Sequence, residues 1–162
     1  NAVGSMDFGG SALNKFYGAD NKHGTKRRTS DVFALATAVL FQSAVQHFAL
    51  APNNMTDAPA WAVAFVKSVP TTWDDVKFIA GYPGKYIVVA RRCGDRWMVA
   101  GINAQREPLK LKLAVPMFAA GSALKVYADN AALEGAVKTV KLSKKQLLDV
   151  TIPCNGGLVV CE

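Results

Sequence analysis

The sequence predicts an α+β chain, in which helices precede residue 70 and an all-β antiparallel sandwich of about eight strands follows it. Two observations predict this fold class. Long apolar runs fill the first part of the chain, whereas apolar and polar residues alternate with a period of two from Val76 onward. Pro70 and the polar residues after it interrupt the helical pattern. We therefore expect two segments, residues 1–70 and residues 71–162.

The chain begins with a short apolar stretch, Asn1–Phe8, which is expected to form a single strand with Asp7 at its exit. A loop rich in Gly, Asn and Ser follows over Gly9–Lys26 and contains no strand that could pair with it. Because no Met precedes Asn1, the chain is expected to be cut from a larger protein.

Two helices are expected next. The residues Thr29–Asp31 are suited to capping a helix, and Val32–Ala51 then runs without a charged residue, Gly or Pro, which predicts one long buried helix. Its length also fits a membrane span, but its polar residues, such as Gln46, would be costly in hydrocarbon, so no span is predicted. A second, shorter helix is predicted over Ala58–Ser68, with Trp61, Phe65 and Val66 on its apolar side.

The second segment reads as strands separated by turn residues, a pattern typical of an antiparallel sandwich. Lysines that alternate with leucines, as at Lys110 and Lys112, are expected on the solvated faces of outer strands. The predicted strands are Asp75–Gly81, Lys85–Cys93, Arg96–Asn103, Leu109–Val115, Ala123–Ala128, Val137–Leu142, Leu147–Ile152 and Gly157–Cys161.

The clearest structural signal is a β-hairpin over Tyr86–Asn103, with its turn at Gly94-Asp95. This turn fixes the register and places Arg92 opposite Trp97. Both faces of the hairpin are largely apolar, so we expect it to be covered on both sides.

Composition excludes several classes of function. The net charge is +7, but the basic residues are spread thinly between apolar strand residues and turns, so no nucleic-acid surface is predicted. The three cysteines, Cys93, Cys154 and Cys161, have no Cys-x-x-Cys spacing, so a metal site is not expected. We interpret them as small buried hydrophobic residues.

No catalytic residue is predicted from the residue pattern. The sequence contains two histidines, and His47 is expected to be a hydrogen-bonded packing residue of the long helix. Asp74 and Asp75 are adjacent on a predicted strand, so their side chains point to opposite faces and cannot flank one glycosidic bond. Their expected role is to form hydrogen bonds at a turn and at the start of a strand.

Exposed aromatic rings offer an alternative function, a free-standing carbohydrate-binding module. Trp73 and Trp97 are its candidate substrate-binding residues. The competing interpretation is that these rings pack in the sandwich, where Arg92 would cover the face of Trp97.

Several stretches resemble glycoside hydrolase family 97. Gly4–Phe8, Lys26–Ser30 and Ala38–Ser43 resemble the last β/α unit of that family's barrel. Ala64–Asp74, which contains Val-Pro-Thr-Thr-Trp-Asp, and Val89–Arg92 with Trp97 resemble the start of its C-terminal β-domain. The resemblance covers nearly the whole chain.

This resemblance implies that residues 1–70 are a remnant of a (β/α)8 barrel and that residues 71–162 are an accessory sandwich of a bacterial α-glucosidase or α-galactosidase. The family's catalytic acid and base and its calcium-binding glutamates then lie upstream, so no catalytic residue, metal or other cofactor is expected in this chain. Asp7 is the candidate for a position near a sugar, because barrel active sites gather at the ends of the strands. The alternative is that Asp7 caps the loop that follows it.

The expected partners are the remainder of the parent barrel and further copies of the chain. The implied location is periplasmic or secreted, in a carbohydrate-utilising bacterium. Separation from the barrel would also expose apolar surface of Val32–Ala51, so this run is expected to self-associate or to rearrange.

Overall fold

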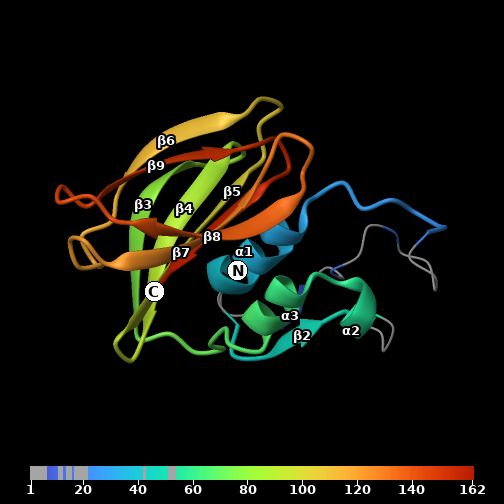
Figure 1. Cartoon of the computed structure of the whole chain (residues 1–162). Coiled ribbons are helices and arrows are strands. Elements are labelled where there is room, and N and C mark those ends of the chain that lie inside the picture. The colour runs from blue at the N-terminus through green and yellow to red at the C-terminus, as the bar shows by residue number, and fades with distance from the viewer. Residues whose placement is uncertain (1–6, 11–12, 14–15, 17–21, 42, 51–53) are drawn as a thin grey trace.

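The computed structural model describes residues 7–10, 13, 16, 22–41, 43–50 and 54–162 (Figure 1). Two short strands and three helices precede the β-rich part, which contains eight strands. The elements are β1 (Phe8–Gly10), α1 (Asp31–Leu40), β2 (Gln46–Phe48), α2 (Asn54–Asp57), α3 (Ala60–Val66), β3 (Asp75–Tyr82), β4 (Tyr86–Cys93), β5 (Arg96–Asn103), β6 (Leu109–Ala114), β7 (Ala123–Asp129), β8 (Gly135–Lys141), β9 (Leu147–Ile152) and β10 (Gly157–Cys161).

The eight predicted strands are confirmed, each with bounds within two residues of the prediction. Six of them form one antiparallel sheet in the order β3-β4-β5-β10-β7-β8, and β6 pairs with β9 in a second sheet. In Figure 1 the β6–β9 sheet and the helices lie on opposite sides of the large sheet. The sheet is therefore covered on both faces, as the apolar hairpin requires.

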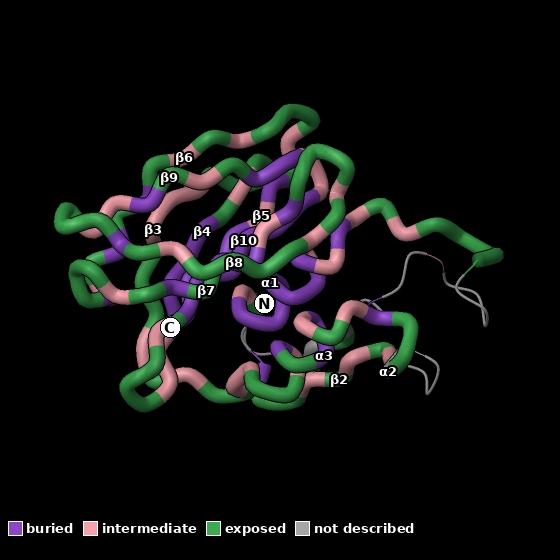
Figure 2. The backbone as a smooth tube through the Cα atoms, in the orientation of Figure 1, coloured by how far each residue is buried: buried purple, intermediate pink, exposed green. Residues whose placement is uncertain are grey.

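One core fills the space between the two sheets. Its side chains come from alternate positions of the large sheet and from the inner face of β6 and β9, as the period of two dictates. Figure 2 shows the buried strands β4, β5 and β10 at the centre of the molecule. The fully buried members include Val88, Ala90, Val99, Leu113, Phe118, Leu124, Ile152, Leu158 and Val160.

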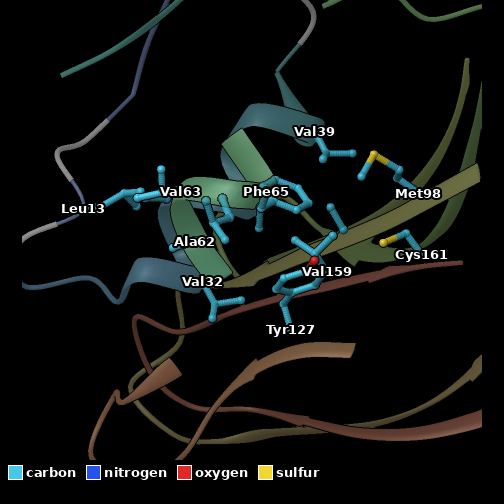
Figure 3. Close-up of a cluster of buried hydrophobic side chains, with 14 of the residues drawn as sticks. Leu13, Val32, Val39, Ala62, Val63, Phe65, Met98, Tyr127, Val159 and Cys161 are labelled. Carbon is cyan, nitrogen blue, oxygen red and sulfur yellow. The ribbon is translucent and has the colours of Figure 1, made fainter. Parts of the chain in front are cut away.

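A second core lies between the other face of the large sheet and helices α1 and α3 (Figure 3). Leu35 and Val39 of α1 are fully buried against the sheet. Phe65 of α3 meets Tyr127 of β7 edge-on, with ring centroids 5.2 Å apart, an arrangement that aromatic pairs favour. The helices and the sandwich therefore share a hydrophobic core, while the division of the chain into domains at residue 70 stays a prediction.

The predicted hairpin register is confirmed at every position. Cys93 pairs with Arg96, Arg92 with Trp97, and Val88 with Gly101. Gly94 adopts a positive φ of 58°, the left-handed conformation that a tight primed turn demands of its first central residue.

The predicted long helix over Val32–Ala51 is wrong in its second half. Helix α1 ends at Leu40, and Phe41 is already extended, with φ −81° and ψ 136°. An apolar run fits a buried helix or a buried strand equally well, and here the second half forms β2 because β1 offers it a backbone partner. None of the helices in the described part of the chain is long and apolar enough to cross a membrane.

The first strand also differs from the prediction. Strand β1 begins at Phe8, runs into the predicted loop, and pairs in parallel with β2, with Gly9 opposite His47. The rest of the predicted strand, residues 1–6, lies outside the described residues. Strands β1 and β2 with α1 between them form a β-α-β connection, and the barrel origin of this segment stays a prediction. The second predicted helix, Ala58–Ser68, corresponds to α3, whereas α2 lies just before it, where the sequence predicts no helix.

Candidate functional site

A buried polar cluster joins the N-terminus of α1 to the large sheet. The Ser30 hydroxyl donates a hydrogen bond of 2.5 Å to Asp129 Oδ2 at the end of β7. The same carboxylate oxygen accepts the backbone N–H of Gly157, at the start of β10, at 2.8 Å. The Ser30 oxygen in turn accepts the N–H of Phe33 at 2.9 Å and so caps α1. We call Ser30, Asp129 and Gly157 the anchor.

The Asp129 carboxyl is unusually placed for a charged group, since the residue is only 9% exposed. Burial raises its pKa, although the hydrogen bonds from Ser30 and Gly157 act in the opposite direction. Nearby Asp31 raises the pKa further and Arg27 lowers it. Among the described residues, Oδ1 of the same carboxyl has no hydrogen-bond partner. The carboxylate thus acts as a buried hydrogen-bond acceptor that joins α1 to the large sheet.

Gly157 lets the helix and the sheet approach closely. A Cβ at this position would lie 2.5 Å from both the N of Phe33 and the O of Val32, which are backbone atoms of α1. Any other residue would push α1 away from β10. The anchor therefore depends on a hydrogen-bonded pair and on the absence of a side chain.

An open pocket of about 820 Å³ lies beside the anchor, between the segment before α1 and the β7–β8 turn. Its lining is polar and of mixed charge. Arg27, which precedes the helix, pairs with Asp31, the first residue of α1, so part of the positive charge is already neutralised. The lining residues include Lys26, Arg28, Thr29, Asp57, Glu134 and Asn155.

Arg91 ties the other end of α1 to the sheet. It is 8% exposed, and one Nη donates a hydrogen bond of 2.9 Å to the carbonyl oxygen of Leu40, the last residue of α1. A cation is favourable at the negative end of a helix dipole. Burial lowers the pKa of the Arg91 guanidinium. Both ends of α1 are thus fastened to the large sheet by buried polar groups.

The two candidate sugar-binding tryptophans lie on opposite faces of the large sheet. Trp73 packs against the core under the helices, with Arg91 6.0 Å from its ring centroid. Trp97 packs against the core between the two sheets, and Lys77 and Arg92 lie 4.8 and 5.9 Å from its ring centroid. The expected packing of Arg92 on Trp97 is confirmed. The two rings do not form a shared platform.

The other predicted residues fall in separate places. Asp7 is exposed and directly precedes β1, so its proposed proximity to a sugar stays a prediction. His47 was expected to pack inside a helix, and this is wrong because it is exposed on β2. The roles expected for Asp74 and Asp75 are confirmed, since they accept the N–H groups of Gly94 and Val76 at 2.7 and 2.8 Å.

Within the residues that the structure describes, no group of three or more His, Cys, Asp or Glu side chains could hold a metal ion. All three cysteines are free thiols. Cys161 is buried as expected, whereas Cys93 and Cys154 are only partly buried.

Sequence reasoning missed the anchor. Ser30 was recognised as a capping residue, but Asp129 ends an ordinary strand and lies 99 residues further along the chain. The available signal was weak: an acid at the end of an apolar strand, next to the turn residues Asn130–Leu133.

Comparison with known proteins shows the family to which the sandwich belongs. The family model described as "Glycosyl-hydrolase 97 C-terminal, oligomerisation" matches residues 72–161. A probable retaining alpha-galactosidase of Streptomyces bingchenggensis is 35% identical over 104 residues, which are 64% of this chain and 15% of that protein. A retaining alpha-galactosidase of Bacteroides thetaiotaomicron is 41% identical over 69 residues, or 43% of this chain and 10% of that protein. The chain thus spans a small part of these relatives.

Solved structures share the whole fold. A crystal structure of a beta-arabinopyranosidase superposes with a TM-score of 0.93 at 50% identity and covers 100% of this chain and 26% of its own. A glycoside hydrolase family 97 enzyme from Pseudoalteromonas sp. strain K8, in complex with acarbose, gives a TM-score of 0.79 at 21% identity over 98% of this chain and 26% of its own. The second likeness shows the fold alone.

Proposed function

Because this chain belongs to the glycosyl-hydrolase 97 family through its C-terminal sandwich, we propose that it is the C-terminal region of a bacterial glycoside hydrolase and serves assembly rather than catalysis. The observation that carries this proposal is the extent of the match. Residues 72–161 take in all eight strands from β3 to β10, and the family describes this unit by its role in oligomerisation.

The way α1 is held supports a structural role. The anchor at one end and Arg91 at the other fix the helix against β5, β7 and β10, and the core under α1 and α3 fills the space between them. A helix held at both ends in this way fixes the relative position of the segments that it joins and takes no part in a reaction. In the parent enzyme, the sandwich would hold the end of the barrel in place and present a surface to a further copy.

The parent enzyme is proposed to act on α-galactosides or on the related arabinopyranosides. The two curated relatives are named as α-galactosidases, and the structure at 50% identity is that of a β-arabinopyranosidase. The pyranose ring of L-arabinose has the hydroxyl arrangement of D-galactose without the exocyclic carbon. One sugar-binding site could therefore accept both an α-galactoside and a β-L-arabinopyranoside. The resemblance first suggested an α-glucosidase or an α-galactosidase, and these names favour the second.

The catalytic carboxylates and calcium ligands are proposed to lie in the upstream barrel, and the parent enzyme to be periplasmic or secreted. Its partners are then the remainder of the barrel and a second copy. Nucleic acid is not proposed as a partner, because the positive charge is dispersed.

The test has two readouts on the purified 162-residue chain. Incubation with nitrophenyl α-galactoside and nitrophenyl β-L-arabinopyranoside is expected to give no hydrolysis above the buffer rate. Analytical ultracentrifugation is expected to show a dimer or a higher oligomer. Turnover that Asp7→Asn abolishes would contradict the non-catalytic assignment, and a monomer at every concentration would contradict the role in assembly.

A further inference from the structure

The large sheet leaves one apolar area uncovered at its β3 edge. Helix α1 packs on β5, β10 and β7, so the same face of the outer strands β3 and β4 extends beyond it. Val76 and Phe78 are 57% and 68% exposed there, and Ile87 is 38% exposed. A cluster of exposed apolar side chains marks an interaction site more often than a single one does. We call these three residues the β3 surface.

A hollow of about 390 Å³ opens beside the Phe78 ring. Ile87 and Ile102 line it, together with the β3–β4 turn. Gly81 keeps it open, since a Cβ at Gly81 would lie 3.3 Å from Cε2 of Phe78 and 2.8 Å from the carbonyl oxygen of Tyr86. The lining is mostly apolar, whereas a sugar site needs several convergent hydrogen-bonding groups. A protein surface fits this hollow better than a saccharide does.

The opposite edge of the sheet is protected in a different way. Strand β8 carries Lys138 and Lys141, both exposed, and charged side chains of this kind discourage association at a sheet edge. Val137 is the large apolar residue exposed on β8, at 38%. Strand β3 also carries an exposed lysine, Lys77, which lies over the Trp97 ring, so the two edges differ in the apolar area that they expose.

We propose that the β3 surface is the contact through which a second copy of this chain docks, with each Phe78 ring inserted in the hollow of the other copy. This proposal rests on the assembly role proposed above and names its surface. A projecting ring and a hollow lie side by side on one patch, so the patch can complement itself about a two-fold axis, as an isologous dimer requires. All three residues also lie within residues 72–161, the part that matches the oligomerisation family.

The experiment compares the dimer dissociation constant of the 162-residue chain and three variants by sedimentation equilibrium. Phe78→Glu puts a charge at the centre of the contact and is expected to weaken the dimer by about 100-fold or more. Val137→Glu on β8 and Val45→Glu beyond the end of α1 introduce the same charge on other exposed apolar residues. Both controls should keep the wild-type dissociation constant.

Each outcome decides the proposal. A wild-type monomer overturns both this proposal and the assembly role. A wild-type dimer that Phe78→Glu leaves intact, or that Val137→Glu or Val45→Glu disrupts instead, overturns the surface assignment alone.

Hydrogen–deuterium exchange of the wild-type chain at two concentrations decides the matter if Phe78→Glu does not fold. We expect slower exchange at the higher concentration for residues 82–87, with no change over β8. Equal exchange of residues 82–87 at both concentrations, in a chain that dimerises, would overturn the proposal.

Discussion

Ser30 and Asp129 are joined by a hydrogen bond of 2.5 Å that spans 99 residues of sequence. The serine is the N-cap of α1 and the aspartate ends β7, so one buried contact holds the first helix in the described part of the chain to the sandwich. This contact is the reason that the two parts of the chain are expected to unfold together.

Ser30→Ala should lower the free energy of unfolding by about 2 to 3 kcal/mol, because it removes a helix cap and leaves the buried Asp129 with one donor fewer. Urea denaturation measures the change. Ser68→Ala is the control, since Ser68 is exposed and its hydroxyl donates to the carbonyl of Phe65 within its own turn. Its effect should stay within about 0.5 kcal/mol. Equal losses of unfolding free energy in the two variants would contradict a stabilising role of the anchor.

The anchor should also make stability depend on pH. The pKa of Asp129 is raised in the folded chain above its ordinary value of 3.8, so the folded state binds more protons than the unfolded state between the two values. The free energy of unfolding of the wild type, relative to Asp129→Asn, should therefore fall as pH rises from about 3.8 through the folded pKa and then level off. Denaturation of both proteins from pH 3.5 to 8 tests this. A difference that rises with pH would reverse the sign and contradict the assignment.

Gly157→Ala should destabilise the chain by about 3 kcal/mol, since the new methyl group meets backbone atoms of α1 that cannot rotate away. Thermal denaturation followed by circular dichroism checks the loss. Gly9→Ala is a matched control, because a Cβ there meets nothing within 4 Å. A Gly157→Ala protein as stable as the wild type would mean that α1 does not lie against β10 as described.

Trp97→Ala should cost about 2 kcal/mol through lost packing and should leave sugar binding unchanged, because none is expected. Calorimetric titration of the wild type with galactosides and maltooligosaccharides should give no heat of binding. Binding heat that disappears in both Trp97→Ala and Trp73→Ala would instead favour the carbohydrate-binding module, although the two rings lie on opposite faces of the sheet.

The strands of the sandwich could be predicted because residues close together in the sequence determine them. The pair Gly94-Asp95 determines the turn of the hairpin, the turn determines that Arg92 faces Trp97, and the period of two assigns each side chain to a face. Both covering layers follow from the fact that neither face of β4 and β5 is polar. All eight strands could therefore be located from the sequence.

The rest could not be predicted because it depends on distant partners. Part of the run after Leu40 forms β2 because β1 is available to pair with it. The residues of the run fit a buried helix and a buried strand equally well, so they do not predict this outcome. The role of Asp129 depends on α1, which brings Ser30 to it, and on β10, which brings the N–H of Gly157. Phe78 was placed on a strand correctly, but its exposure follows from the limited reach of α1 across the sheet.

The most direct test of the account is the mass of the wild-type chain in solution by sedimentation equilibrium over a wide range of concentrations. A C-terminal assembly domain of a family 97 glycosidase is predicted to approach at least twice the monomer mass of 17.3 kDa as concentration rises. A mass of 17.3 kDa at every concentration would contradict it.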